Sequence, residues 1–199
     1  MKKFGLLILL VLVALAVAAP VASARPTIVI DAGHGGHDRG GIPGQRFPEK
    51  VYALDVAKRV ESRLKSAGFK TVMTRSGDYF VGLRQRCAVA NKISNSVFLS
   101  IHFNSGKREG ANGIETYYYN SRSGGFAAAI HKRVLRAAGT EDRKVRKRGF
   151  YVIRNTHRPA VLAELGFLTN RKEGSRCSSA SHRQKLANAL ADGVIAMYK

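Results

Sequence analysis

Four side chains capable of metal or acid–base chemistry lie at the edges of short apolar segments. His34 falls in a glycine-rich stretch directly after TIVID, His102 ends SVFLSIH, and Glu164 lies near the end of AVLAELG. Glu49 follows Pro48, where a segment with helical spacing begins. If the apolar segments are strands of one open α/β sheet, residues near their carboxyl ends can converge on one point.

Two imidazoles and one carboxylate are a common ligand set of catalytic zinc, which keeps a fourth position for water. We therefore predict that His34, Glu49 and His102 bind one Zn²⁺ per chain. A second carboxylate, outside the ligand set, can take a proton from that water and return it to a leaving nitrogen. Glu164 is the candidate, because an acid within an apolar strand is costly to bury without a partner.

Each of these residues also has a purely structural interpretation. A histidine after a strand is often a hydrogen-bonded loop residue, and a glutamate at a helix start often interacts favourably with the helix dipole. The four residues are separated by long intervals, so no short ligand spacing decides between the interpretations. Their combination favours a metallohydrolase.

The elements that would position these residues alternate along the chain. The first helical segment, for example, has Leu54, Ala57 and Leu64 on one face and Gly68 just beyond its end. The resulting pattern predicts a single α/β domain, with an open, mostly parallel but mixed sheet and helices on both faces. Helices are expected over 50–67, 83–92, 126–138 and 182–198, strands over 27–31, 69–75, 96–102, 113–119, 150–154 and 160–166, and a charged connector over 141–148.

The first 24 residues are typical of a secretory signal peptide. Lys2 and Lys3 precede an apolar run that ends in small residues at Ala24, and the strictly apolar part, 4–19, is shorter than a membrane-spanning helix requires. A membrane anchor is the less favoured alternative. We expect cleavage after Ala24, which would leave residues 25–199 as one domain without a membrane span, exported to the cell wall, the periplasm or the exterior.

The chain is strongly basic, with a formal net charge of +21 at neutral pH. Without Lys2 and Lys3, 32 basic and 13 acidic residues remain, a formal charge of +19. Such a surface attracts polyanions. For an exported protein these would be anionic envelope polymers rather than nucleic acid. The two cysteines, Cys87 and Cys177, are not in a metal-binding spacing, and the sequence leaves open whether they form a disulfide.

Four sequence blocks carry a family resemblance. IVIDAGHGGHDRGG, PEK, VFLSIHFNS and GFYVIRNTHRPAVLAELGFLTN follow one another as in the zinc-dependent N-acetylmuramoyl-L-alanine amidases of the type called amidase 3, and the resemblance extends over residues 27–198. It implies a six-stranded fold and hydrolysis of the amide between the lactyl group of N-acetylmuramic acid and the L-alanine of the peptidoglycan stem peptide. The family's metal ligands match His34, Glu49 and His102, and its catalytic glutamate matches Glu164.

Three residues beside these blocks suit supporting roles, although structural roles remain equally open. Asp31 could orient an imidazole, Asn104 could bind substrate, and Arg154 could hold a carboxylate of the stem peptide. Some family members carry an additional helix that occludes the site. Only 61 residues separate His102 from Glu164 and the predicted elements fill them, so no occluding helix is expected.

Two other functions remain open at this point. The same ligand chemistry would serve a zinc peptidase that cuts within the stem peptide. A non-catalytic wall-binding module would use only the basic surface. A nucleic-acid-binding role fits an exported chain with carboxylates in apolar strands poorly.

Overall fold

The computed structural model describes residues 25–43, 45–108 and 110–199, and the predicted signal peptide lies outside these residues. Its centre is a six-stranded sheet with the strand order β2-β1-β3-β6-β4-β5. All neighbouring strands are parallel except β4 and β6, which are antiparallel. The strands are β1 (Thr27–Ala32), β2 (Thr71–Met73), β3 (Ser96–Asn104), β4 (Ile114–Tyr118), β5 (Asp142–Lys147) and β6 (Ala160–Phe167).

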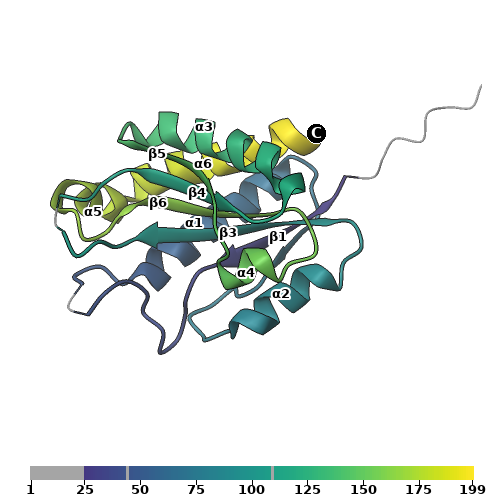
Figure 1. Cartoon of the computed structure of the whole chain (residues 1–199), viewed down its shortest axis with the longest axis horizontal. Helices are drawn as coiled ribbons and strands as arrows, with labels where there is room; N and C mark the ends of the chain where they lie inside the picture. Colours follow the sequence, from purple (N-terminus) through teal and green to yellow (C-terminus); the bar gives the residue numbers. More distant parts are fainter. Residues whose placement is uncertain (1–24, 44, 109) are drawn as a thin grey trace, which may run out of the picture.

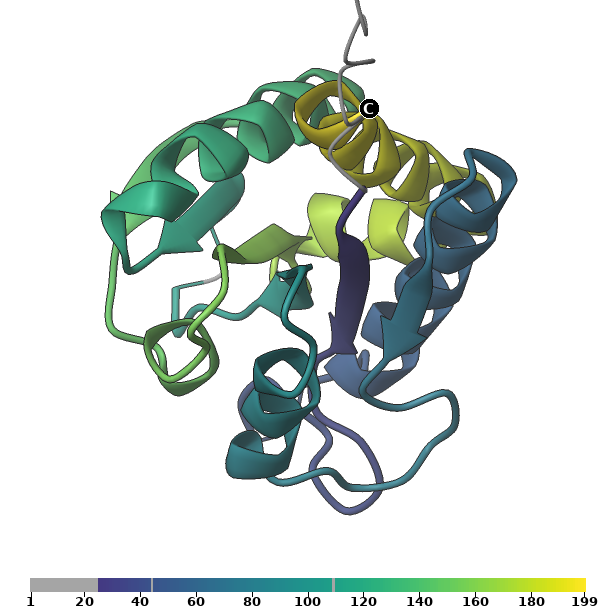
Figure 2. The same ribbon diagram turned by 90° about the vertical axis from the view of Figure 1, so that its right-hand side faces the viewer.

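Helices cover both faces of this sheet (Figures 1 and 2). They are α1 (Glu49–Ser66), α2 (Leu83–Asn91), α3 (Gly124–Ala138), α4 (Tyr151–Arg154), α5 (Arg171–Ser178) and α6 (Ala180–Tyr198), with a 3₁₀ turn at Ser121–Ser123. This architecture confirms the predicted fold class. Within the described ranges, no helix is both long enough and apolar enough to cross a membrane.

The side chains of the strands alternate between two apolar cores. Ile28 and Ile30 of β1 join the larger core with α1, α3 and α6, whereas Val29 joins the smaller core with α2 and α4. Successive side chains of a strand point to opposite faces, so a strand buried on both faces is a continuous apolar run. This is the physical reason why TIVID is recognisable as a central strand.

Two sequence-based predictions of secondary structure were wrong. Residues 141–148, expected to be a connector, contain β5, which forms the sheet edge and therefore keeps charged side chains in water. Residues 150–154, expected to be a strand, form the one-turn helix α4, whose Val152 and Ile153 face the smaller core. A short apolar run does not distinguish a strand from a buried helical turn.

Helix α5 was missed by the sequence analysis. Its N-terminus is capped by Asn170, whose side chain accepts hydrogen bonds from the backbone N–H groups of Lys172 and Glu173. The signal was an asparagine cap followed three residues later by a glutamate. It was obscured because α5 has almost no apolar residues.

Both cysteines are buried and free. Cys87 belongs to the smaller core and Cys177 to the larger one, so the sheet separates them. The structure thus answers the open question about a disulfide: the two thiols do not pair.

Candidate active site

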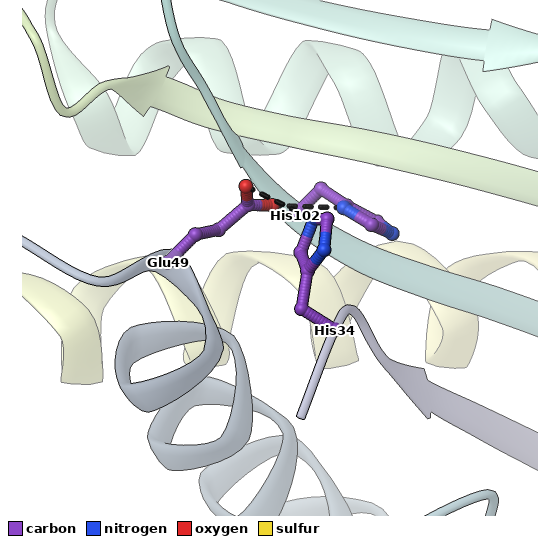
Figure 3. Close-up of side chains that lie close together, drawn as sticks. All are labelled: His34, Glu49 and His102. Carbon is purple, nitrogen blue, oxygen red and sulfur yellow. Dashed lines mark hydrogen bonds and ion pairs between the residues drawn. The ribbon is translucent and has the colours of Figure 1, made fainter. Parts of the chain in front are cut away.

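Three of the residues predicted from sequence meet at one point (Figure 3). His34 lies in the turn after β1, Glu49 is the first residue of α1, and His102 lies on β3. Glu49 Oε2 is 3.0 Å from His34 Nε2, and Glu49 Oε1 is 2.8 Å from His102 Nδ1. One potential ligand atom from each residue lies within 4.8 Å of the others, so the group could hold a metal ion.

The charges of this group depend on one another. Although burial favours the neutral acid, hydrogen bonds from His102 and His34 lower the pKa of Glu49 to about 2. Burial likewise opposes a charge on His102, but its hydrogen bond to Glu49 and nearby carboxylates raise the pKa of His102 to about 9. Glu49 is therefore held in its anionic form. The structure offers a carboxylate and two imidazoles, the donor set that zinc prefers.

Two glycines of the AGHGGHDRGG segment make this close approach possible. A Cβ atom at Gly33 would lie 2.4 Å from Cε1 of His102, and one at Gly40 would lie 2.7 Å from Oε2 of Glu49. His34 itself has φ of 61°, a conformation that is uncommon for residues other than glycine and that is often found at functional sites. The turn thus places the His34 ring beside Glu49 and His102 at the cost of local backbone strain.

A buried arginine fixes this turn against α1. Arg75 is fully buried and donates hydrogen bonds to the carbonyl oxygens of Ala32, Gly33 and Lys50, at 2.7–2.9 Å. It therefore connects the end of β1 to the first turn of the helix that carries Glu49. The sequence analysis missed Arg75 because an arginine after a strand is usually exposed.

Asp31 does not orient an imidazole, and this prediction was wrong. Its buried carboxylate accepts hydrogen bonds from Thr74 Oγ1, Arg86 Nη1 and Ser100 Oγ. Arg86 also donates to the carbonyl oxygen of His34 at 2.7 Å. Asp31 and Arg86 thus hold the His34 turn by its backbone, while Asp31 joins β1 to its neighbours.

The residue that orients the His34 ring is Asp38. Asp38 Oδ2 lies 2.8 Å from His34 Nδ1, and Asp38 Oδ1 accepts the Gly40 N–H. A carboxylate on the far ring nitrogen fixes the tautomer and orientation of a metal-binding histidine. The signal in the sequence was the four-residue spacing within HGGHD, which sequence reasoning left unused.

We expect Asp38→Ala to weaken zinc binding by about 10- to 100-fold, the usual loss when such an orienting partner is removed. Competition with a chromogenic chelator measures the change. Asp192→Ala is the matched control, because Asp192 on α6 forms an exposed ion pair with Arg63 of α1. Equal zinc affinity in the two variants would contradict the role of Asp38.

Glu164 lies beside His102 in the sheet. The register pairs Glu164 of β6 with His102 of β3 on one side and with Glu115 of β4 on the other. Burial raises the pKa of Glu164 to about 8. The nearby carboxylates of Glu49 and Glu115 also raise this pKa, whereas His102 lowers it. Its Oε2 atom is buried and has no hydrogen-bond partner among the described residues. This atom is therefore free to accept a hydrogen bond from a group outside the chain, such as a water molecule or a substrate.

Glu115 is a site residue that the sequence analysis missed. Its Oε2 accepts hydrogen bonds from Asn104 Nδ2 and from the Tyr117 hydroxyl, each at 2.7 Å. Arg143 Nε lies 3.2 Å from Glu115 Oε1. An acid within GIETYYY gives the same signal that singled out Glu164, namely a carboxylate in an apolar strand.

The two predicted substrate-binding residues lie in different surroundings. Asn104 is held by Glu115 and accepts the N–H of Ser105, while Arg154 is exposed on α4. Their roles in substrate binding stay predictions. Two observations bear on whether an additional helix occludes the site. His34 and His102 are partly exposed. Between β5 and β6, the only helix is the one-turn α4.

Comparisons with known proteins identify the family of this chain. The family model for N-acetylmuramoyl-L-alanine amidase matches residues 28–196. The N-acetylmuramoyl-L-alanine amidase LytC of Bacillus subtilis is 38% identical over 177 residues, which cover 87% of this chain and 36% of LytC. This chain thus spans about a third of that relative.

Solved structures show the same fold. The catalytic domain of the amidase CwlV from Bacillus (Paenibacillus) polymyxa superposes with a TM-score of 0.83 at 42% identity, over 86% of this chain and 97% of that domain. The amidase AmiC2 of Nostoc punctiforme has a TM-score of 0.81 at 36% identity, over 88% and 98% of the two chains. The match of fold, sequence and family model leads to one conclusion: this chain belongs to the N-acetylmuramoyl-L-alanine amidase family.

Proposed function

We propose that this protein is a zinc-dependent hydrolase that cuts the amide between the lactyl group of N-acetylmuramic acid and the L-alanine of the peptidoglycan stem peptide. One observation carries the proposal. The convergent group of His34, Glu49 and His102 lies beside Glu164, a buried carboxylate in register with His102 that has an atom without a partner in the described chain.

The donors fit one Zn²⁺ per chain. In a tetrahedral site with bonds of about 2.0–2.1 Å, ligand atoms lie about 3.3 Å apart. Glu49 contacts His34 at 3.0 Å and His102 at 2.8 Å through different carboxylate oxygens, and one potential ligand atom from each of the three residues lies within 4.8 Å of the others. When bound, zinc polarises a carbonyl and lowers the pKa of a water molecule towards neutrality.

The residues of the chain then perform the proton transfers. In the proposed mechanism Glu164 takes a proton from the attacking water and delivers it to the amide nitrogen. A bond forms between the water oxygen and the lactyl carbon, the carbon–nitrogen bond breaks, and the products are a carboxylate and the amino group of L-alanine. Asp38 keeps His34 oriented, and the backbone N–H of Phe103 holds Glu49 Oε1 at 3.0 Å.

Metal content and product chemistry on one purified sample test this function. We expect one zinc per chain and, after digestion of peptidoglycan, new L-alanine amino termini together with free lactyl carboxylates. Cleavage within the stem peptide would instead establish the zinc peptidase. Wall binding that survives a chelator, with no cleavage product from the zinc-loaded sample, would establish the non-catalytic module.

We further propose that the protein is exported, acts at the cell wall, and contacts anionic envelope polymers through its basic surface. The edge strand β5 supports a specific contact region. Arg146 and Lys147, together with the following Arg148, are exposed, and none forms an ion pair with a described acidic residue. Three adjacent unpaired cations on a sheet edge suit a flexible polyanion.

Release from isolated walls should therefore depend strongly on salt. Replacing Arg146, Lys147 and Arg148 by serine should roughly halve the salt concentration that releases half of the bound protein, because exposed charges are screened over about 10 Å at 0.1 M salt. Serine at Lys132, Arg136 and Lys185 is the control with the same charge change on exposed helical positions. Equal shifts in both triple variants would assign retention to net charge rather than to β5.

A further inference from the structure

A cavity of about 430 Å³ opens beside the two histidines of the site. His34 and His102 form part of its wall, so the cavity adjoins the candidate metal site. The remaining wall is mostly apolar and comes from the segment before α2, the start of α2, α4 and β6. The side chains that matter here are Phe80, Val81, Leu83, Phe150, Tyr151 and Leu162.

Four of these side chains are exposed at the cavity. Leu83 is 53% exposed, Phe80 50%, Phe150 43% and Tyr151 39%. Scattered exposed apolar residues are common, but a group of them around one hollow marks a binding surface. Two are held in place by neighbours: the Phe150 ring packs 4.8 Å from that of Tyr117, and the Phe80 ring packs 4.3 Å from that of His37. Their faces are thus ordered before a ligand binds, which lowers the entropic cost of binding.

The charged groups of the wall are already neutralised. Arg86 donates from all three of its nitrogens, to Asp31 and to the carbonyl oxygens of Val81, Ala32 and His34. The Asp38 carboxylate is occupied by His34 and Gly40. Apart from the metal site proposed at His34 and His102, none of the described lining residues offers an uncommitted cation to a ligand carboxylate. A charged group in the apolar part of the cavity, away from the two histidines, would lose its hydration without gaining a partner.

The two sides of the scissile amide differ in this respect. The stem peptide ends in a carboxylate. The N-acetylmuramoyl side is uncharged and presents a lactyl methyl, an acetamido methyl and the C–H faces of a sugar ring. Such groups pack well on aromatic faces, which are electron-rich.

We infer that this cavity is the subsite for the N-acetylmuramoyl group, with Phe80, Leu83 and Phe150 as its specificity-determining contacts. The inference deepens the proposed function and rests on it. It orients the substrate, because the acyl part of the amide lies towards α2 and α4 and the stem peptide must leave the site in another direction.

Leu83→Asp is the central variant of the test. Leu83 is the first residue of α2, where an acidic side chain favours the helix, so the substitution should leave folding intact while it places a charge in the cavity. Leu83→Met is the matched control that keeps the apolar surface. Phe150→Ala removes an aromatic face, and Met197→Ala removes a similarly exposed apolar side chain on α6, outside the cavity wall.

Binding is measured first, by NMR titration with two uncharged probes, N-acetylmuramoyl carboxamide and lactamide, which lacks the sugar. For N-acetylmuramoyl carboxamide, Leu83→Asp and Phe150→Ala should each raise Kd about tenfold, and both controls should leave it unchanged. For lactamide no variant should change Kd by more than about twofold. Unchanged Kd for the sugar probe in both cavity variants, or equal losses for the two probes, would overturn the subsite.

Cleavage provides the second readout. With N-acetylmuramoyl-peptide and lactyl-peptide substrates that share the same scissile bond, kcat/KM should fall about tenfold in the cavity variants for the first substrate only. The binding result does not depend on turnover. If the sugar probe binds as expected but no variant or parent protein cuts either substrate, the proposed function fails and the subsite stands.

Discussion

Glu164→Ala is expected to keep its zinc and to lose about a thousandfold in kcat on purified peptidoglycan. A positioned general base contributes roughly 10²- to 10⁴-fold, and Glu164 is the carboxylate beside the ligand group that is not itself among the three ligands. Zinc content is measured on the same sample as turnover. Glu164→Gln should lose a similar factor, because it keeps the shape of the side chain but cannot accept the proton.

The stability of the variant separates a catalytic from a structural role. The buried Glu164 carboxylate has an atom without a partner in the described chain, so its replacement removes a cost of desolvation and should leave the melting temperature unchanged or higher. Glu61→Ala, on the partly exposed side of α1, is the control for activity. A Glu164→Ala protein that still digests peptidoglycan would show that another group carries the proton.

His102→Ala should lose both metal and activity. The substitution removes one of three ligands, so zinc affinity should fall by more than the roughly 10- to 100-fold expected for an orienting partner such as Asp38. Because a ligand stabilises the state that binds it, a chelator should lower the melting temperature of the parent protein and have little effect on this variant. Zinc analysis and thermal melts with and without chelator measure both effects.

His131→Gln is the matched control for this experiment. His131 is a buried histidine on α3 that interacts with Thr116 and Asp142, away from the ligand group. We expect it to keep its zinc while losing about 1–3 kcal/mol of stability through its broken hydrogen bonds. Zinc retention in His102→Ala equal to that in His131→Gln would refute the assignment of His102 as a ligand.

Several features of the fold were readable in the sequence because they depend on local patterns. Strands buried on both faces are continuous apolar runs, so β1, β3 and β6 were predicted nearly to the residue. Since parallel strands end at the same edge, the placement of His34 and His102 followed from the strands that precede them. Glu164 was identifiable because an acid in an apolar strand is costly to bury without a partner. Glu49 depended mainly on the family resemblance.

Local pattern failed where the surroundings of a segment decide its structure. The highly charged segment at β5 is a strand only because β4 offers it a parallel partner and because the sheet edge faces water. The apolar segment at α4 is helical because Val152 and Ile153, adjacent in sequence, both reach the smaller core. Neither condition is visible within the segment itself.

The sequence by itself thus determined the fold class, two histidines at strand ends and the unusual acid of β6. Only the tertiary structure decided how they are held. Arg75 and Arg86 donate hydrogen bonds to backbone carbonyl oxygens of the His34 turn, which lies 42 to 54 residues away in the chain. On β4, the neighbour of Glu164 is Glu115, 49 positions earlier. The reason is physical: a buried charge is stable only with partners, and those partners come from whichever strands and turns the fold brings together.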